Sequence, residues 1–197
     1  RGRLVLPATD LSWYDAQESL RQLNTYVIEE GNRRIKKGAP PLIPWEQGST
    51  GFFRLPTEGE WEFAARGGRR GIVTKGPLHS VFDESSGGYR IPGLKEIANM
   101  GKTRQGATVA GVGGHKPNVI GIYDTVGNAS EWVHGLFGLI RPDREHGASG
   151  GMVLRGGNSL TPETIIGIAH RQEMPPFAVD GEAKSNLTGM RVILTSP

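Results

Sequence analysis

The chain has 197 residues, of which 36% are apolar and 22% are charged, with a formal net charge of +3 and no cysteine. We expect one α+β domain over residues 1–197, because this length and apolar content suit a single core, whereas 30 glycines and 13 prolines are too many for a helical bundle. The small, interspersed charge does not favour nucleic acid, no apolar run approaches the ~20 residues of a membrane helix, and the lack of cysteine excludes disulfides, thiolate catalysis and cysteine-ligated metals.

The first predicted element is an amphipathic helix from Ser12 to about Glu30. Ser12 and Asp15 have the spacing of an N-cap and an acidic third residue. Apolar residues then recur at intervals of three and four, at Trp13, Ala16, Leu20, Leu23 and Val27. Gly31 is expected to end this helix.

A basic run follows the predicted helix, at Arg33, Arg34, Lys36 and Lys37. It stands before a proline-rich stretch that leads to Trp45, so we expect a loop. A charge run is most often a solvated surface. The alternative is a partner-binding surface formed by Trp45, Arg33 and Arg34, with Trp45 as an exposed aromatic anchor.

A second, shorter helix is predicted behind Pro56. Thr57 and Glu60 form a capping box, Glu58 adds a second acid to the first turn, and Trp61 begins the inward face. The glycine pair at 67–68 ends the helix.

The remainder of the chain predicts short strands between long loops. Residues 71–116 lack a regular apolar period and should contain little secondary structure. Short β-branched or apolar runs predict strands at residues 119–123, 151–155, 165–170 and 190–195. Two helices with a few short antiparallel strands describe an α+β fold.

Four sequence blocks resemble the formylglycine-generating enzyme family, also called the sulfatase-modifying factor domain. They are RLPTEGEWEFAARGG from Arg54, VGNASEW from Val126, LRGGNS from Leu154 and GMRVIL from Gly189. The resemblance implies a fold related to the C-type lectin fold. It also implies structural roles for the residues of these blocks that we single out: Arg54, Glu60, Trp61, Arg155 and Arg191.

The same resemblance removes the family's best-known chemistry. Catalytic members hold copper on a pair of cysteines shortly after the Arg-Gly-Gly motif. Here Arg155 is followed by two glycines and then by Asn158, Ser159 and Thr161, with no thiol. Hydroxyls cannot replace thiolates as ligands of monovalent copper, so we expect neither copper nor formylglycine-generating activity. Iron is not expected either, because the five histidines show no metal-binding spacing.

Calcium is the metal that the resemblance does favour. Asp124 and Glu131 flank a turn whose main-chain carbonyls at Gly127 and Ala129 can face the same centre, and calcium prefers such oxygen ligands. The alternative is that the two carboxylates only cap a turn. A second family calcium site, which would begin at Asn99, is expected to be empty because residues 101–114 contain no Asp or Glu.

Without the thiols, we expect a non-enzymatic protein-binding or regulatory module. The resemblance extends to TagR-like periplasmic regulators that act upstream of a membrane-spanning Ser/Thr kinase in type VI secretion. This implies a periplasmic location and a protein partner, such as a kinase sensor domain or an outer-membrane lipoprotein, without membrane insertion. One alternative is a PvdO-type periplasmic enzyme of siderophore maturation. Another is a ligand-binding protein of diversity-generating retroelements, with residues 158–191 as the variable face.

Overall fold

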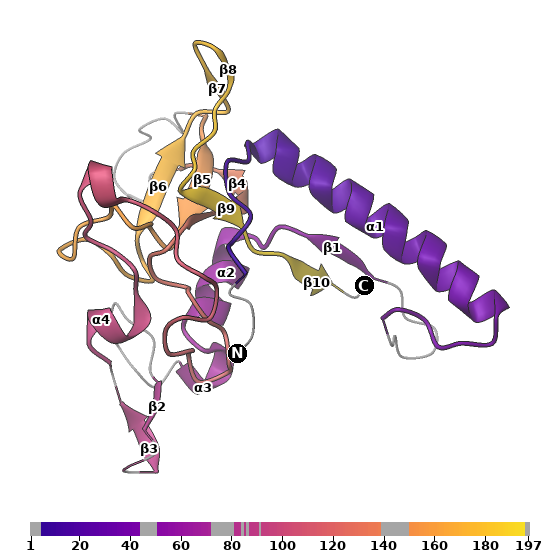
Figure 1. The fold of residues 1–197 in the computed structure, drawn as a ribbon, viewed down its shortest axis with the longest axis horizontal. Helices are drawn as coiled ribbons and strands as arrows, with labels where there is room; N and C mark the ends of the chain where they lie inside the picture. Colours follow the sequence, from indigo (N-terminus) through magenta and orange to yellow (C-terminus); the bar gives the residue numbers. More distant parts are fainter. Residues whose placement is uncertain are drawn as a thin grey trace.

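The computed structural model of the chain describes residues 5–43, 51–71, 81–83, 85, 87–90, 92–138 and 150–195. In this part an irregular body holds short strands and short helices, while the long helix α1 and a two-stranded ribbon extend from one side (Figure 1). The architecture is α+β, as predicted. None of the helices in these segments is both long and apolar enough to cross a membrane.

The first helix, α1 (Trp13–Lys36), begins where the sequence predicts but ends later. Ser12 and Asp15 form the predicted capping box. The helix continues through Gly31, so the predicted end at this residue is wrong. Glu30 pairs with Arg33 across the point where the helix was expected to stop, and basic residues in the last turn favour the helix dipole. The helix instead ends at Lys37, followed by Gly38 in a left-handed conformation.

The second helix, α2 (Glu58–Ala65), agrees with the prediction, including the capping box of Thr57 and Glu60. Two helices were expected and four α-helices are found in the described residues. The additional helices are only four residues long, α3 (Gly68–Gly71) and α4 (Leu94–Ile97), and a 3-10 helix follows at Arg104–Gly106. Such short turns leave no apolar period in a sequence.

The central sheet has four strands in the order β6-β5-β4-β9. Their bounds are β4 (Ser130–Leu136), β5 (Met152–Arg155), β6 (Arg171–Met174) and β9 (Thr188–Met190). Neighbours in this sheet are antiparallel except β4 and β9, which are parallel. Short antiparallel strands were expected, and the parallel β4–β9 pair is an addition to them.

Three two-stranded units complete the described strands. β1 (Phe52–Arg54) pairs with β10 (Ile193–Thr195), which lies close to the C-terminal end of the sequence. The other two are hairpins, β2 (Val81–Asp83) with β3 (Gly88–Arg90) and β7 (Phe177–Ala178) with β8 (Gly181–Glu182). The described residues between 71 and 116 thus hold only short elements, as expected.

Two of the four predicted strands do not form. Residues 119–123 make a turn around Asn118, whose side-chain oxygen accepts from the main-chain N–H groups of Ile120 and Ile122. Residues 165–170 also turn, because the N–H groups of Ile165 and Ile166 donate to the Pro162 carbonyl. Local hydrogen bonds therefore outcompete the apolar composition. The run at 151–155 gives β5, and the run at 190–195 is divided between β9 and β10.

Two clusters of buried side chains lie on opposite faces of β4 and β5. Neighbouring residues of each strand point to opposite faces, so Val133 and Val153 join Trp61 of α2 in one cluster. Trp132 and Leu154 join Ala16 and Leu20 of α1 in the other. The sheet therefore lies between the two longest helices.

Candidate functional site

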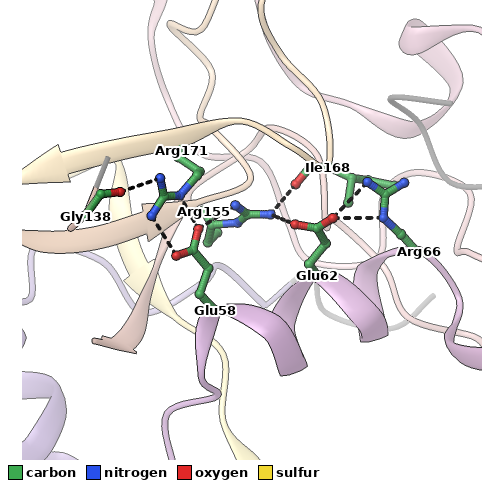
Figure 2. Close-up of polar contacts among 7 residues, drawn as sticks. All are labelled: Glu58, Glu62, Arg66, Gly138, Arg155, Ile168 and Arg171. Carbon is green, nitrogen blue, oxygen red and sulfur yellow. Dashed lines mark hydrogen bonds and ion pairs between the residues drawn. The ribbon is translucent and has the colours of Figure 1, made fainter. Parts of the chain in front are cut away.

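A network of charged side chains joins α2 to the central sheet (Figure 2). At its centre Arg155 of β5 is only 1% exposed. One of its terminal nitrogens donates to Glu58 Oε1 at 2.7 Å, and the other donates to Glu62 Oε2 and to the Ile168 carbonyl, both at 2.7 Å. Its guanidinium also lies over the Trp61 ring, 5.1 Å from the centroid. Arg155 thus holds the helix to the strand through both carboxylates.

Two further arginines complete this network. Arg171 of β6 donates to both Glu58 oxygens and to the Gly138 carbonyl. Arg66 donates to Glu62 from the end of α2, at 2.8 and 3.0 Å. Each acid therefore lies between two arginines, and neither carboxylate is free.

The electrostatics of the network favour the ionised form of Glu62. Burial acts to raise the pKa of Glu62, but Arg66 and Arg155 outweigh it, so the pKa is lowered. Burial and then Arg155 lower the pKa of the adjacent His170, which is neutral at pH 7. In the described residues every carboxyl pKa that departs clearly from its ordinary value is lowered. A carboxyl group that acts as a general acid near neutral pH needs a raised pKa. The lowered pKa of Glu62 therefore favours a structural role for this network.

The segment after Arg155, where the family places its thiols, is a closed turn. Gly156 and Gly157 both have positive φ, of 84° and 70°. The Thr161 hydroxyl accepts from the Asn158 N–H at 2.9 Å, and the Thr161 N–H returns to the Asn158 carbonyl at 2.9 Å. Ser159 is fully buried. The Thr161 hydroxyl therefore helps to close the turn, and the Ser159 hydroxyl is buried without a hydrogen bond to any described residue.

Three of the four predicted calcium ligands, Asp124, Ala129 and Glu131, line a cavity of about 570 Å³. Glu131 is already well satisfied. Its two oxygens accept from Arg191 at 2.7 and 2.9 Å, and one of them also accepts from the Trp61 indole at 2.6 Å.

Asp124 differs from Glu131 in having an oxygen to spare. Its backbone has a positive φ of 54°, and its Oδ2 accepts from the Gly113 N–H at 2.6 Å. Its Oδ1 is buried without a hydrogen bond, and the nearest charged-group contact is His115 Nδ1 at 3.5 Å. Gly127 also has a positive φ, and a side chain there would meet the Asn99 carbonyl.

These features fit a calcium ion in part. Asp124 offers a free carboxylate oxygen, whereas the Glu131 carboxylate would have to be shared with Arg191 and Trp61. No group of three or more His, Cys, Asp or Glu side chains that could hold a metal is found where the structure describes the chain. The proposed ligand set has two carboxylates and two main-chain carbonyls, so calcium at this turn stays a prediction.

Of the other residues singled out in the sequence, Arg191 also lines this cavity, whereas Arg54, Arg33 and Arg34 do not. Arg54 makes a two-pronged pair with Glu60, with both distances 2.7 Å. Arg33 and Arg34 lie in the last turn of α1 and not in a loop: Arg33 pairs with Glu30, and Arg34 donates to the Pro40 carbonyl at 2.8 Å. Trp45 lies outside the described residues, so the structure does not place it beside them.

Sequence reasoning did not connect Glu58, Glu62 and Arg171 with Arg155. Glu58 was visible only as an acidic residue of a helix's first turn. The pairs with Arg155 and Arg171 join residues far apart in the sequence, and no local pattern predicts such contacts. One signal was available: Glu58 and Glu62 are four residues apart, which places both on one face of α2.

Comparison with known proteins gives a match over nearly the whole chain. The profile of the family described as "Sulfatase-modifying factor enzyme 1-like domain" matches residues 1–196. The serine/threonine-protein kinase pkn1 of Chlamydia pneumoniae is 31% identical over 174 residues, which are 81% of this chain and 25% of the kinase. The chaperone protein LppX of Paenibacillus barcinonensis is 28% identical over 151 residues, covering 64% of this chain and 50% of LppX. The chain thus spans between a quarter and half of these two relatives.

Solved structures share the fold at lower identity. Treponema denticola variable protein 1 has a TM-score of 0.61 at 24% identity, with 98% of this chain and 72% of that chain covered. PvdO from Pseudomonas aeruginosa also has a TM-score of 0.61, at 21% identity, with 98% and 62% covered. These likenesses support the fold and carry no statement about activity.

Proposed function

Because the chain belongs to the sulfatase-modifying factor enzyme 1-like domain family yet contains no cysteine, we propose that it is a non-catalytic protein-recognition domain. The observation that carries the proposal is the turn after Arg155. Asn158 and Thr161 close this turn by hydrogen bonds, where catalytic relatives need thiols. The scaffold is thereby retained without its reactive group.

The charged network beside this turn supports the same proposal. Arg155 joins Glu58 and Glu62 between a strand and a helix through both of its terminal nitrogens. Groups bound in this way stabilise a platform, and recognition residues commonly lie on the loops that such a platform positions. The long irregular connections of this fold offer many such loops.

The names of the matched proteins support a narrower form of the proposal. One relative is named a chaperone and two, from Chlamydia pneumoniae and Chlamydia trachomatis, are named serine/threonine-protein kinases. We therefore propose a role next to a Ser/Thr kinase, with a kinase sensor domain or an outer-membrane lipoprotein as the partner. A periplasmic location and the control of type VI secretion are the finer form of this proposal. Since the chain spans 25% and 19% of the two kinases, kinase activity is not assigned to it.

Two measurements test the proposal together. The purified protein is incubated with a cysteine-containing sulfatase peptide, copper and oxygen, and the peptide mass is followed. We expect no change, because no thiolate is available to bind copper. In parallel, photo-crosslinking in cells of the source organism should yield a defined protein adduct. Loss of the peptide thiol with formation of an aldehyde above a protein-free blank would overturn the non-catalytic assignment.

A further inference from the structure

The β7–β8 hairpin carries apolar side chains where a surface turn is normally polar. It projects from the body at the end of the sheet away from β2 and β3 (Figure 1). Phe177 pairs with Glu182 and Ala178 with Gly181, so Val179 and Asp180 form the turn. Val179 is fully exposed, at 109% of its reference area, and Phe177 is 59% exposed. Two-residue turns favour Asn, Asp and Gly, so the turn itself does not select Val179.

The exposed ring of Phe177 is held in place from below. Its centroid lies 5.5 Å from that of Tyr14, and Tyr14 makes an edge-to-face contact with Trp13, also at 5.5 Å. Trp13 packs against the second core cluster. The hairpin is further tied to the start of α1 by the Ser12 hydroxyl, which donates to Glu182. An apolar element held in this way loses little conformational entropy when it binds.

Acidic groups surround these apolar residues. The ammonium group of Lys184, at the base of the hairpin, forms an ion pair with Asp15 at 2.7 Å. The pKa of Lys184 is raised first by Asp15, and Glu182 and Asp10 add to the effect, so three carboxylates lie near a single ammonium group. Asp180 at the tip has no hydrogen bond or ion pair with any residue that the structure describes. The rim of the apolar tip is therefore negative.

One flank of the hairpin is also hollow. A cavity of about 530 Å³ is lined by Met174, Pro175, Ala178, Asp180, Glu182, Ala183 and Lys184. Lys184 in this lining is paired with Asp15, so the apolar side chains and the carboxylates of Asp180 and Glu182 suit the long stem and charged end of a Lys or Arg side chain. The tip would be the convex part of such a contact, and this cavity the concave part.

We propose that the β7–β8 hairpin is the docking element of this domain and that it takes a protein surface with a small apolar depression bordered by Lys or Arg side chains. The inference rests on the proposed recognition function and names its surface. Complementary charge selects a basic partner and speeds encounter. An anionic membrane is disfavoured, because the carboxylates of Asp180 and Glu182 would approach lipid phosphates.

The test uses random peptides displayed on phage and selected on the immobilised wild-type protein. We expect the selected peptides to combine apolar residues with Lys or Arg. Their affinity should fall about tenfold or more for Val179→Asp, and Asp180→Lys should also weaken them. The matched control is Ile28→Asp, which places the same charge on an exposed apolar residue of α1 and should leave the affinity unchanged. Because Val179 buries nothing, its substitution should leave the melting temperature unchanged.

Several outcomes would overturn the inference. One is selection of peptides without basic residues, or of peptides that bind Val179→Asp as well as wild type; the recognition function would then stand on another surface. Failure of any peptide to be enriched would count against the hairpin as a docking element. If the protein sediments together with phosphatidylserine vesicles, the partner is a membrane and not a protein. Self-association that Val179→Asp abolishes would identify a second copy as the occupant. Failure of the proposed function itself appears separately, as turnover in the thiol assay.

Discussion

The indole N–H of Trp61 donates to the Glu131 carboxylate at 2.6 Å, and this buried hydrogen bond joins α2 to β4. The same carboxylate takes two hydrogen bonds from Arg191, which follows β9. One acid therefore joins a helix, the central strand and the segment near the end of the sequence. Removing it would leave an indole and a guanidinium without their acceptor in a largely buried place.

We expect Glu131→Ala to lower the free energy of unfolding by about 2 kcal/mol, because it leaves the Trp61 indole N–H and the partly buried Arg191 guanidinium without this acceptor. Urea denaturation measures the change. The control is Glu18→Ala, which removes an exposed ion pair with Arg21 and should change the free energy of unfolding far less. Equal losses for the two variants would contradict the assigned role of Glu131.

Arg155→Lys should lower the free energy of unfolding by about 2 kcal/mol or more although the charge is kept. A lysine ammonium cannot reproduce the fork that reaches Glu58, Glu62 and the Ile168 carbonyl. Arg54→Lys is the matched control, since its pair with Glu60 is far more exposed. Denaturation of both variants should separate them, and a tolerated lysine at position 155 would show that the network contributes little.

Stability should fall as the pH is lowered from about 4.5 towards 2. Arg54, and then the Thr57 N–H, hold the pKa of Glu60 at about 2, below its ordinary value of 4.5. A carboxyl group with a lowered folded-state pKa stabilises the protein above its unfolded pKa, and this contribution is lost as the group is protonated. Melting temperatures across this window should decline less steeply for Glu60→Gln. Glu29→Gln, on the exposed part of α1, should retain the wild-type slope.

Calcium should raise the melting temperature, and a chelator should lower it, because an ion that binds only the folded state stabilises it by mass action. Asp124→Ala is the sharper variant, since it removes both side-chain oxygens, whereas an asparagine would still offer calcium a carbonyl oxygen. We expect it to abolish the calcium dependence. Glu131→Ala is less informative here, because it also breaks the contacts with Trp61 and Arg191. If neither calcium nor a chelator shifts the melting temperature, the prediction of a calcium site is wrong.

The elements that could be predicted are those encoded locally. Capping boxes at Ser12 and Thr57 lie within four residues, and they gave both main helix starts correctly. The prediction that the first helix ends at Gly31 is wrong, because a glycine is only weakly unfavourable inside a helix. The Glu30–Arg33 ion pair spans this position.

What could not be predicted depends on contacts between distant segments. The strand β4 is not predicted from the sequence. Its burial on both faces comes from α1, α2 and neighbouring strands, which are distant in the sequence. The Arg155 network and the second partners of Glu131 also join residues far apart in the sequence. Sequence blocks gave the family and hence the scaffold. They could not show that the Asn158 turn is closed or that Val179 projects into solvent.

The pairing of β1 with β10 has a consequence for how this protein is made. Phe53 lies opposite Leu194, and β9 completes the sheet beside β4 only shortly before β10 is reached. Contacts of such large sequence separation form late and slow the folding of a chain. During synthesis, β1 and β4 must wait for partners that are made well after them, β10 and β9. Until those segments emerge, these strand edges stay open to other contacts.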